Sequence, residues 1–287
     1  MKKLIPLSLI VIFVAWACQP KKEAETVSGV PTLTLKWQTD TLLTTSESVI
    51  YDEANDILYV ANINGVPDAK DGNGFISKVS LDGKITDAKW IIGLDAPKGL
   101  GIYQGKLYVA DIDRVHEIDI AAGKVLNSFV AEGSKFLNDI TTGSDGKVYA
   151  SDTGAGEVLV LENGSFTKWL TGQAGPNGLL AEGNNVLIAL WDTKTLNSAE
   201  LGAQQVILKT DSIENPDGIE AMGNGGYLVS SWNGMVHYID KDGKNTMVLD
   251  TRADSIGAAD IEYIPSKNLL LVPTFYKNSI MAYEVKQ

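Results

Sequence analysis

The chain has 287 residues, of which 44% are hydrophobic and 21% are charged, an ordinary composition for one large domain or two smaller ones. Its formal net charge is −12, and so acidic a body argues against binding to nucleic acid and against electrostatic docking on anionic lipid. The chain contains one cysteine, so no internal disulfide can form and a packed core must supply its stability.

The N-terminus has the pattern of an export signal. Lys2 and Lys3 precede an apolar run from Leu4 to Val14, and small residues follow before Cys18. The apolar run is shorter than a membrane-spanning helix requires, so we predict a signal peptide over residues 1–17. The position of Cys18 resembles that of the lipidated cysteine of bacterial lipoproteins. The alternative is ordinary signal cleavage beside an incidental cysteine.

If Cys18 is lipidated, it becomes the first residue of the mature protein. Residues 18–31 are mostly polar and predict a flexible tether between this lipid anchor and the folded body. We therefore expect an exported protein of the bacterial cell envelope, in the periplasm or at the outer membrane. Its membrane contact would be the acyl chain rather than its charge.

From residue 32 onward the chain consists of short apolar runs bounded by Gly, Asn and Asp. This pattern indicates many short strands and no convincing helix. A similar unit recurs about every forty residues with four short strands in each, which is typical of a β-propeller. Six units begin at or near Glu47, Lys98, Asn138, Asn177, Asp217 and Asp260.

The two ends of the repeat complement each other. The last unit lacks one strand, while the apolar run at residues 33–37 has no unit of its own. We therefore predict an all-β fold, a six-bladed β-propeller over residues 32–287, with the N-terminal strand completing the last blade. Closing the ring in this way removes an exposed sheet edge. We expect the protein to be a monomer.

Two segments exceed the repeat and are predicted insertions, residues 65–74 in the first unit and residues 191–204 in the fourth. Insertions of this kind lie on one face of a propeller and often border its binding site. We expect the tryptophans to pack within the blades rather than form a platform for sugar rings, an expectation that is weakest for Trp191 and Trp232.

The two histidines fall at the same place in their repeats. His116 stands in Val-His-Glu-Ile-Asp and His237 in Val-His-Tyr-Ile-Asp, which indicates structural roles. Because no Gly-x-Ser-x-Gly segment is present either, a catalytic triad built on histidine is not expected.

The start of each innermost strand points toward the central channel of a propeller, so the six unit starts predict a ring of polar side chains. Glu47, Asn177 and Asp217 offer oxygen ligands, which suit a hard divalent cation. The alternative is that polar residues occupy these places because the channel is wet. Asn or Asp before Gly is also ordinary turn chemistry.

Three of the unit starts resemble motifs of one enzyme family. Glu47, Pro176-Asn177-Gly178 and Pro216-Asp217-Gly218 are similar to segments of the senescence-marker-protein/gluconolactonase/luciferin-regenerating-enzyme family, and the likeness covers essentially the whole mature chain. The resemblance implies a six-bladed propeller in which these Glu, Asn and Asp residues bind one divalent cation, with Asp217 also the general base. Ca²⁺ is the first expectation, with Mg²⁺, Mn²⁺ or Zn²⁺ as alternatives.

Asn138 lies in Phe136-Leu137-Asn138-Asp139, which resembles a family segment whose Asn contacts substrate or metal-bound water. Two departures put sugar-lactone specificity in doubt. Phe136 stands where the sugar-lactone hydrolases often have Arg, and Lys98 adds a cation to the ring. We expect Asn138 and Lys98 to contact substrate, and Asp260 to lie in the second layer behind the metal ligands.

These features favour a divalent-metal-dependent hydrolase of the lactonase or esterase type, acting on a small-molecule lactone or ester. The alternative is a non-catalytic propeller that serves as a binding or interaction module at the cell envelope. The two hypotheses predict different arrangements of the ring residues. An enzyme needs Glu47, Asn177 and Asp217 to converge on one cation, whereas in a scaffold they point apart or pair with Lys98.

Overall fold

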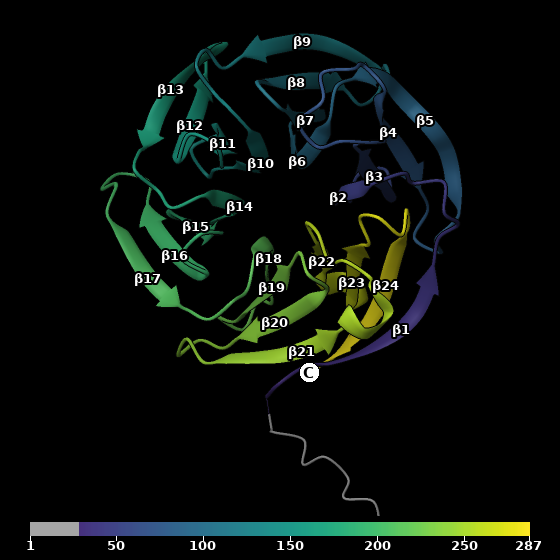
Figure 1. Ribbon diagram of the computed structural model, residues 1–287, viewed down its shortest axis with the longest axis vertical. Helices are drawn as coiled ribbons and strands as arrows, with labels where there is room; N and C mark the ends of the chain where they lie inside the picture. The colour runs from purple at the N-terminus through teal and green to yellow at the C-terminus, as the bar shows by residue number, and fades with distance from the viewer. Residues whose placement is uncertain (1–28) are drawn as a thin grey trace, which may run out of the picture.

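The computed structural model describes residues 29–287, which form six four-stranded sheets arranged as blades around a central axis (Figure 1). The predicted six-bladed β-propeller is therefore confirmed. The predicted signal peptide, Cys18 and most of the tether lie outside the described residues. Between residues 29 and 287 the helical elements are two 3₁₀ turns, Arg252–Asp254 and Pro265–Lys267. No helix in this range is long and apolar enough to cross a membrane.

Each of the first five blades is an antiparallel meander of four consecutive strands, numbered outward from the axis. The first two blades comprise β2 (Ser46–Asp52), β3 (Ile57–Asn62), β4 (Gly74–Val79), β5 (Ile85–Leu94), β6 (Pro97–Tyr103), β7 (Lys106–Asp111), β8 (Arg114–Asp119) and β9 (Lys124–Val130). The next two comprise β10 (Leu137–Thr142), β11 (Val148–Asp152), β12 (Glu157–Glu162), β13 (Ser165–Leu170), β14 (Pro176–Glu182), β15 (Asn185–Leu190), β16 (Thr195–Glu200) and β17 (Val206–Thr210). The fifth comprises β18 (Pro216–Ala221), β19 (Tyr227–Ser231), β20 (Met235–Ile239) and β21 (Asn245–Asp250).

The sixth blade joins the two ends of the described chain. Its strands are β22 (Glu262–Ile264), β23 (Leu269–Pro273), β24 (Ile280–Lys286) and, outermost, β1 (Thr32–Gln38). β1 pairs antiparallel with β24, with Leu33 opposite Val285, and lies beside it at the rim of the disc in Figure 1. The predicted closure by the N-terminal strand is confirmed, and it leaves β24 without an unpaired edge.

The apolar core lies between neighbouring blades rather than on the axis. One cluster, for example, joins Tyr59 and Ile76 of blade one to Leu107 and Ile118 of blade two, all essentially inaccessible to solvent. Two tryptophans belong to these layers as predicted. Trp90 stacks on Tyr59 at 4.8 Å between ring centroids, and Trp169 meets Tyr149 edge-on at 5.0 Å. Most of the apolar core therefore lies between the blades, and the ring residues that face the channel are polar.

The innermost strands are irregular where they approach the axis. In β6, β10, β14 and β18 the pairing with the next strand shifts register just after the first residue, at the ring position, and β2 shifts at Glu47. A bulge leaves the extra residue out of the ladder and re-aims its side chain. The bulges therefore account for polar residues that point into the channel from otherwise apolar strands.

Gly178 and Gly218 follow two of these ring residues because neighbouring inner strands touch there. A Cβ atom on Gly178 would stand 1.8 Å from the backbone oxygen of Asp217, and one on Gly218 would stand 2.3 Å from Oδ1 of Asp260. Both glycines lie inside strands, and neither is among the residues of positive φ. Turn chemistry is therefore the wrong explanation for the Asn-Gly and Asp-Gly pairs, and close approach of the strands is the right one.

Replacing Gly178 with Ala is expected to destabilise the propeller by about 3 kcal/mol or more, because the obstructing atom is backbone and cannot rotate away. Urea denaturation measures this. Gly202→Ala is the control, because a Cβ there meets nothing within 4 Å, and its effect should stay within about 0.5 kcal/mol. Equal stabilities of the two variants would contradict the close-approach explanation.

Candidate functional site

A cavity of about 230 Å³ lies where the innermost strands begin. It contains five of the six predicted ring residues, so the structure brings these together in one place. Its lining consists of Glu47, Ile63, Pro67, Lys98, Phe136, Asn138, Thr153, Asn177, Trp191, Asp217, Trp232 and Phe275. We call this cavity the ring pocket.

The three predicted metal ligands are buried at the floor of the ring pocket. Glu47 is 5% exposed, Asn177 2% and Asp217 3%. The side-chain amide of Asn177 donates to Oδ1 of Asp217 at 3.1 Å and to the carbonyl of Pro216 at 3.3 Å. Within residues 29–287, Oε2 of Glu47 and Oδ1 of Asn177 are buried without any hydrogen-bond partner. Folded proteins rarely leave such oxygens unsatisfied, so both are available to accept a cation or a water molecule.

This donor set fits a hard divalent cation. Two carboxylates and an amide oxygen are typical ligands of Ca²⁺ or Mg²⁺. Across the described chain no three His, Cys, Asp or Glu side chains gather closely enough to hold a metal by themselves. A cation in the ring pocket would therefore rely on Asn177 and on water in addition to Glu47 and Asp217.

The electrostatics of the floor also favour a cation. Burial raises the pKa of Glu47 well above its usual range, and the nearby charges of Asp217 and Asp260 raise it further. Burial, followed by the charge of Asp260, likewise raises the pKa of Asp217, while the hydrogen bond from Asn177 lowers it. Ionised together, these carboxylates are poorly compensated, and a bound cation would relieve the repulsion.

Lys98 is not paired with the carboxylates at the floor of the ring pocket. Its Nζ donates to the carbonyl of Ala96 at 2.9 Å and lies 4.5 Å from the ring centroid of Phe136. It forms no ion pair with a carboxylate among residues 29–287. Burial lowers the pKa of Lys98 to about 8, against the opposing attraction of Glu47. The amino group of Lys98 thus lies in the same pocket as the three predicted metal ligands without pairing with them.

Asn138 is oriented by a residue that the sequence analysis missed. Its Nδ2 donates to Oγ1 of Thr153 at 3.3 Å, and Thr153 donates in turn to the carbonyl of Pro176 at 2.7 Å. Thr153 immediately follows the second strand of its blade, β11. Three more lining residues hold the same place in their blades, namely Ile63, Trp191 and Trp232. This repeat position is the signal that would have found them.

Trp191 and Trp232 correct the prediction that the tryptophans pack within blades. Both line the ring pocket, with their ring centroids 6.4 Å apart. The predicted insertion at residues 191–204 is also wrong, because it contains the regular strand β16. Trp191 instead reaches the pocket from the short turn between β15 and β16.

Asp260 lies apart from the ring pocket. Its Oδ2 accepts a hydrogen bond from Ser48 Oγ at 2.7 Å, and its backbone N–H donates to the carbonyl of Glu47 at 2.9 Å. It lines a second cavity of about 330 Å³ along the channel, together with Asp139, Glu220 and Glu262. Burial raises the pKa of Asp260 to about 7. Asp260 therefore contacts Glu47 through backbone atoms, while its side chain faces the other cavity.

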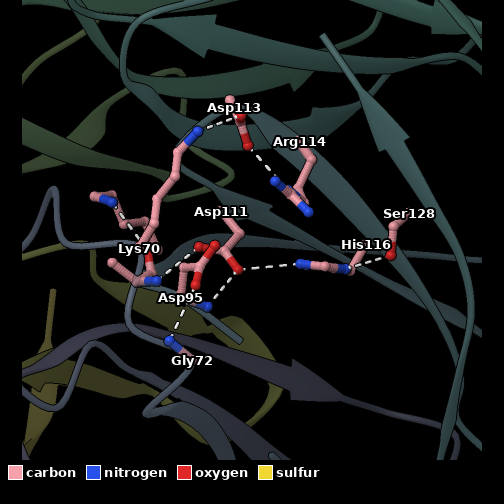
Figure 2. A network of polar contacts seen from close by, with 10 residues as sticks. Lys70, Gly72, Asp95, Asp111, Asp113, Arg114, His116 and Ser128 are labelled. Carbon is pink, nitrogen blue, oxygen red and sulfur yellow. Dashed lines mark hydrogen bonds and ion pairs between the residues drawn. The ribbon is translucent and has the colours of Figure 1, made fainter. Parts of the chain in front are cut away.

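The loop that leads to Lys98 is held by Asp111, at the end of β7 (Figure 2). Asp111 accepts hydrogen bonds from the backbone N–H groups of Asp95 and Ala96, both at 2.7 Å, and lies 3.0 Å from Nε2 of His116. Asp152 in the next blade accepts two backbone bonds before Asn138 in the same manner. An Asp at the end of the second strand thus positions the ring residue of its blade.

His116 completes a Ser–His–Asp sequence of contacts, since its Nδ1 lies 2.8 Å from Ser128 Oγ (Figure 2). The geometry is not that of a nucleophilic site. Neither His116 nor Ser128 lines the ring pocket, and both oxygens of Asp111 hold backbone N–H groups. These contacts agree with the expected structural role of His116.

Two contacts drawn in Figure 2 fasten the loop that contains residues 65–74. Lys70 forms an ion pair with Asp113, and the N–H of Gly72 donates to Asp95 at 3.0 Å. The loop contributes Pro67 to the pocket lining. The predicted insertion in blade one is therefore confirmed, and it borders the site.

Comparison with known proteins adds a fold relationship. No protein-family model and no curated protein matches the sequence. Among solved structures, a putative gluconolactonase has a TM-score of 0.66 and 17% identity, with 90% of this chain and 93% of that chain covered. A gluconolactonase from Xanthomonas campestris has a TM-score of 0.65 and 15% identity over 85% and 86% of the two chains.

Virginiamycin B lyase from Staphylococcus aureus also matches, with a TM-score of 0.65 and 13% identity over 89% of this chain and 99% of the lyase. At these identities the comparisons show a shared fold. The chain is a six-bladed β-propeller of the architecture found in gluconolactonases and in this lyase.

The acidic cavity predicts a pH dependence of stability. Burial, the largest cause, raises the pKa of Glu262 to about 8, so the folded state holds a proton that the unfolded state releases near pH 4.5. This contribution to stability is complete below about pH 4.5 and is lost as the pH rises to about 8. Glu262→Gln should match the parent at pH 5 and exceed it by on the order of 1 kcal/mol at pH 9, measured by urea denaturation. A constant difference between pH 5 and pH 9 would contradict this assignment.

Proposed function

We propose that this protein is a divalent-metal-dependent hydrolase of lactones or esters. One observation carries the proposal: two buried, unsatisfied oxygens, on Glu47 and Asn177, lie in the same pocket as Asp217. A wet channel would not require these side chains to gather. Residues 29–287 contain four other buried polar atoms without a partner, on Asn62, Ser134, Trp169 and His237, but none of these residues lines the ring pocket. The gluconolactonases with the same fold support the reaction class by analogy.

The chain's own residues can carry out the hydrolytic steps. Asp217 uses Oδ1 to accept the amide of Asn177, which leaves Oδ2 to take a proton from the attacking water. Asn138, held by Thr153, would orient the substrate, and Lys98 would favour negative charge that develops on the carbonyl oxygen.

A divalent cation held by Glu47, Asn177 and Asp217 would polarise the substrate carbonyl as a Lewis acid. Ca²⁺ is our first choice because the ligands are all oxygens, and Mg²⁺, Mn²⁺ and Zn²⁺ are the alternatives. We also propose an exported, monomeric lipoprotein anchored at the cell envelope through Cys18, a residue outside the described range.

Removing and restoring the cation tests the metal site. After chelation, adding the correct cation at a hundred times its Kd should raise the melting temperature by about 5–10 °C, because ligand binding stabilises the folded state. Glu47→Gln, Asn177→Ala and Asp217→Asn should each remove most of the increase. Glu262→Gln, an acid-to-amide change in the other cavity, should keep it. If Ca²⁺, Mg²⁺, Mn²⁺ and Zn²⁺ all leave the parent unchanged, the metal proposal fails.

Turnover of a lactone and ester panel tests the base. Asp217→Asn should lower kcat by about 10²–10⁴-fold at a cation concentration that saturates the variant, because the amide cannot accept the water's proton. Glu262→Gln again serves as the matched control and should keep parental kcat. Unimpaired turnover by Asp217→Asn would remove this residue as the base.

A further inference from the structure

The ring pocket has an apolar wall above its polar floor. Six apolar side chains supplied by five of the blades and the segments between them form it: Ile63, Pro67, Phe136, Trp191, Trp232 and Phe275. The other channel cavity is lined by aliphatic side chains and by the acidic residues Asp139, Glu220, Asp260 and Glu262, and Tyr51 is the one aromatic residue in its lining. The two cavities therefore suit different occupants.

Trp232 is the centre of the aromatic part of this wall. Its ring lies 6.4 Å from Trp191, 5.4 Å from Phe275 and 6.0 Å from Tyr276, measured between centroids. Tyr276 is 64% exposed, so the aromatic surface continues from the buried pocket out to its rim. Aromatic rings arranged in this way offer a large apolar contact area to a ligand that enters from solvent.

Phe275 is held in the wall by an unusual backbone. Its φ is 51°, in the left-handed region that a bulky residue rarely adopts. Thr274 and Ser279 close the turn through their hydroxyl groups at 2.9 Å, and Asn278 accepts the N–H of Thr45 from blade one at 2.8 Å. These contacts fix the position of the Phe275 ring in the wall.

The wall offers few partners for a polyhydroxylated ring. Thr153 already donates to Pro176, and Lys98 donates to Ala96. Of the apolar wall's side chains, only the indole N–H groups of Trp191 and Trp232 can donate a hydrogen bond. A sugar lactone that packs against this wall would therefore place hydroxyl groups against side chains that cannot pair with them, which disfavours binding. An apolar substituent has no hydrogen-bonding group to leave unpaired, and its contact with the rings would stabilise binding.

We propose that the ring pocket takes a lactone or ester with an apolar, preferably aromatic, acyl portion, which packs against Trp191, Trp232 and Phe275. This inference rests on the proposed hydrolase function and names its substrate class. In the reaction, water adds to the acyl carbon, the acyl C–O bond breaks, and the water's proton passes through Asp217 to the leaving oxygen. The products are a carboxylic acid and an alcohol, joined in one molecule when the substrate is a lactone.

The size of the cavity limits the substrate further. At about 230 Å³ it is smaller than the ~300 Å³ at which pockets for drug-sized ligands begin. One lactone ring fused to, or carrying, a single apolar group fits this volume. Longer substituents would extend along the exposed face of Tyr276.

The test compares three δ-lactones on the cation-loaded protein. Dihydrocoumarin, which carries a fused benzene ring, should have a KM at least about 10-fold below that of unsubstituted δ-valerolactone, and glucono-δ-lactone should have the highest KM of the three. KM is compared because the phenol of dihydrocoumarin leaves more readily than an alkanol, which raises kcat without any contact to the pocket. Trp232→Ala should raise the KM for dihydrocoumarin by about 10-fold or more and leave δ-valerolactone within about threefold. Trp191→Ala provides the same test if Trp232→Ala does not fold. Trp90→Phe, which alters a tryptophan packed between blades, should leave the KM values of both substrates unchanged.

A binding measurement separates this inference from the proposed function. The lactam analogue of dihydrocoumarin cannot be hydrolysed readily, and its binding to Asp217→Asn should be lost in Asp217→Asn/Trp232→Ala. If lactam binding depends on Trp232 but no lactone or ester is hydrolysed, the hydrolase proposal fails and the apolar ligand class stands. If glucono-δ-lactone is the best substrate, the hydrolase stands and the apolar class is overturned. If the lactam does not bind and no lactone or ester is hydrolysed, both proposals are overturned.

Discussion

The close approach of the innermost strands around one axis is the constraint on which the rest of the structure depends. At Gly178 and Gly218 neighbouring strands leave no room for a Cβ atom, and bulges beside these glycines turn the ring residues inward. The same crowding removes Glu47 and Asp217 from water and raises the pKa of both carboxyl groups. The close approach of the strands thus accounts both for the inward direction of the ring residues and for the raised pKa values of Glu47 and Asp217.

Burying carboxylates without partners destabilises the folded state, and the blades must offset that cost elsewhere. The apolar layers between blades and the pairing of β1 with β24 supply the stabilising side. The hydrogen bonds that Asp111 and Asp152 accept from the loops ahead of Lys98 and Asn138 then hold the ring residues in place. The packing and strand pairing of the blades thus offset the free-energy cost of burying the carboxylates at the site.

The two parts of the channel differ because the residues that face them come from different positions of the same repeat. The ring residue and the residue after the second strand line one cavity, which becomes part polar and part aromatic. Residues further along the innermost strands, including Glu220 and Glu262, line the other. A propeller of similar blades is therefore asymmetric along its axis, and the cluster of aromatic rings distinguishes the cavity that we assign to substrate.

The sequence by itself determined the number of blades, the closure by the N-terminal strand and five of the residues that meet in the ring pocket. It could do so because a repeat reports equivalent positions directly, and the start of each unit marks the same place on each inner strand. Only the tertiary structure decided that Asp260 joins the other cavity, that Lys98 pairs with Ala96 rather than with an acid, and that Trp191 and Trp232 face the pocket. Those outcomes depend on bulges and on contacts between blades, which set the direction of a side chain and are made by residues far apart in the chain.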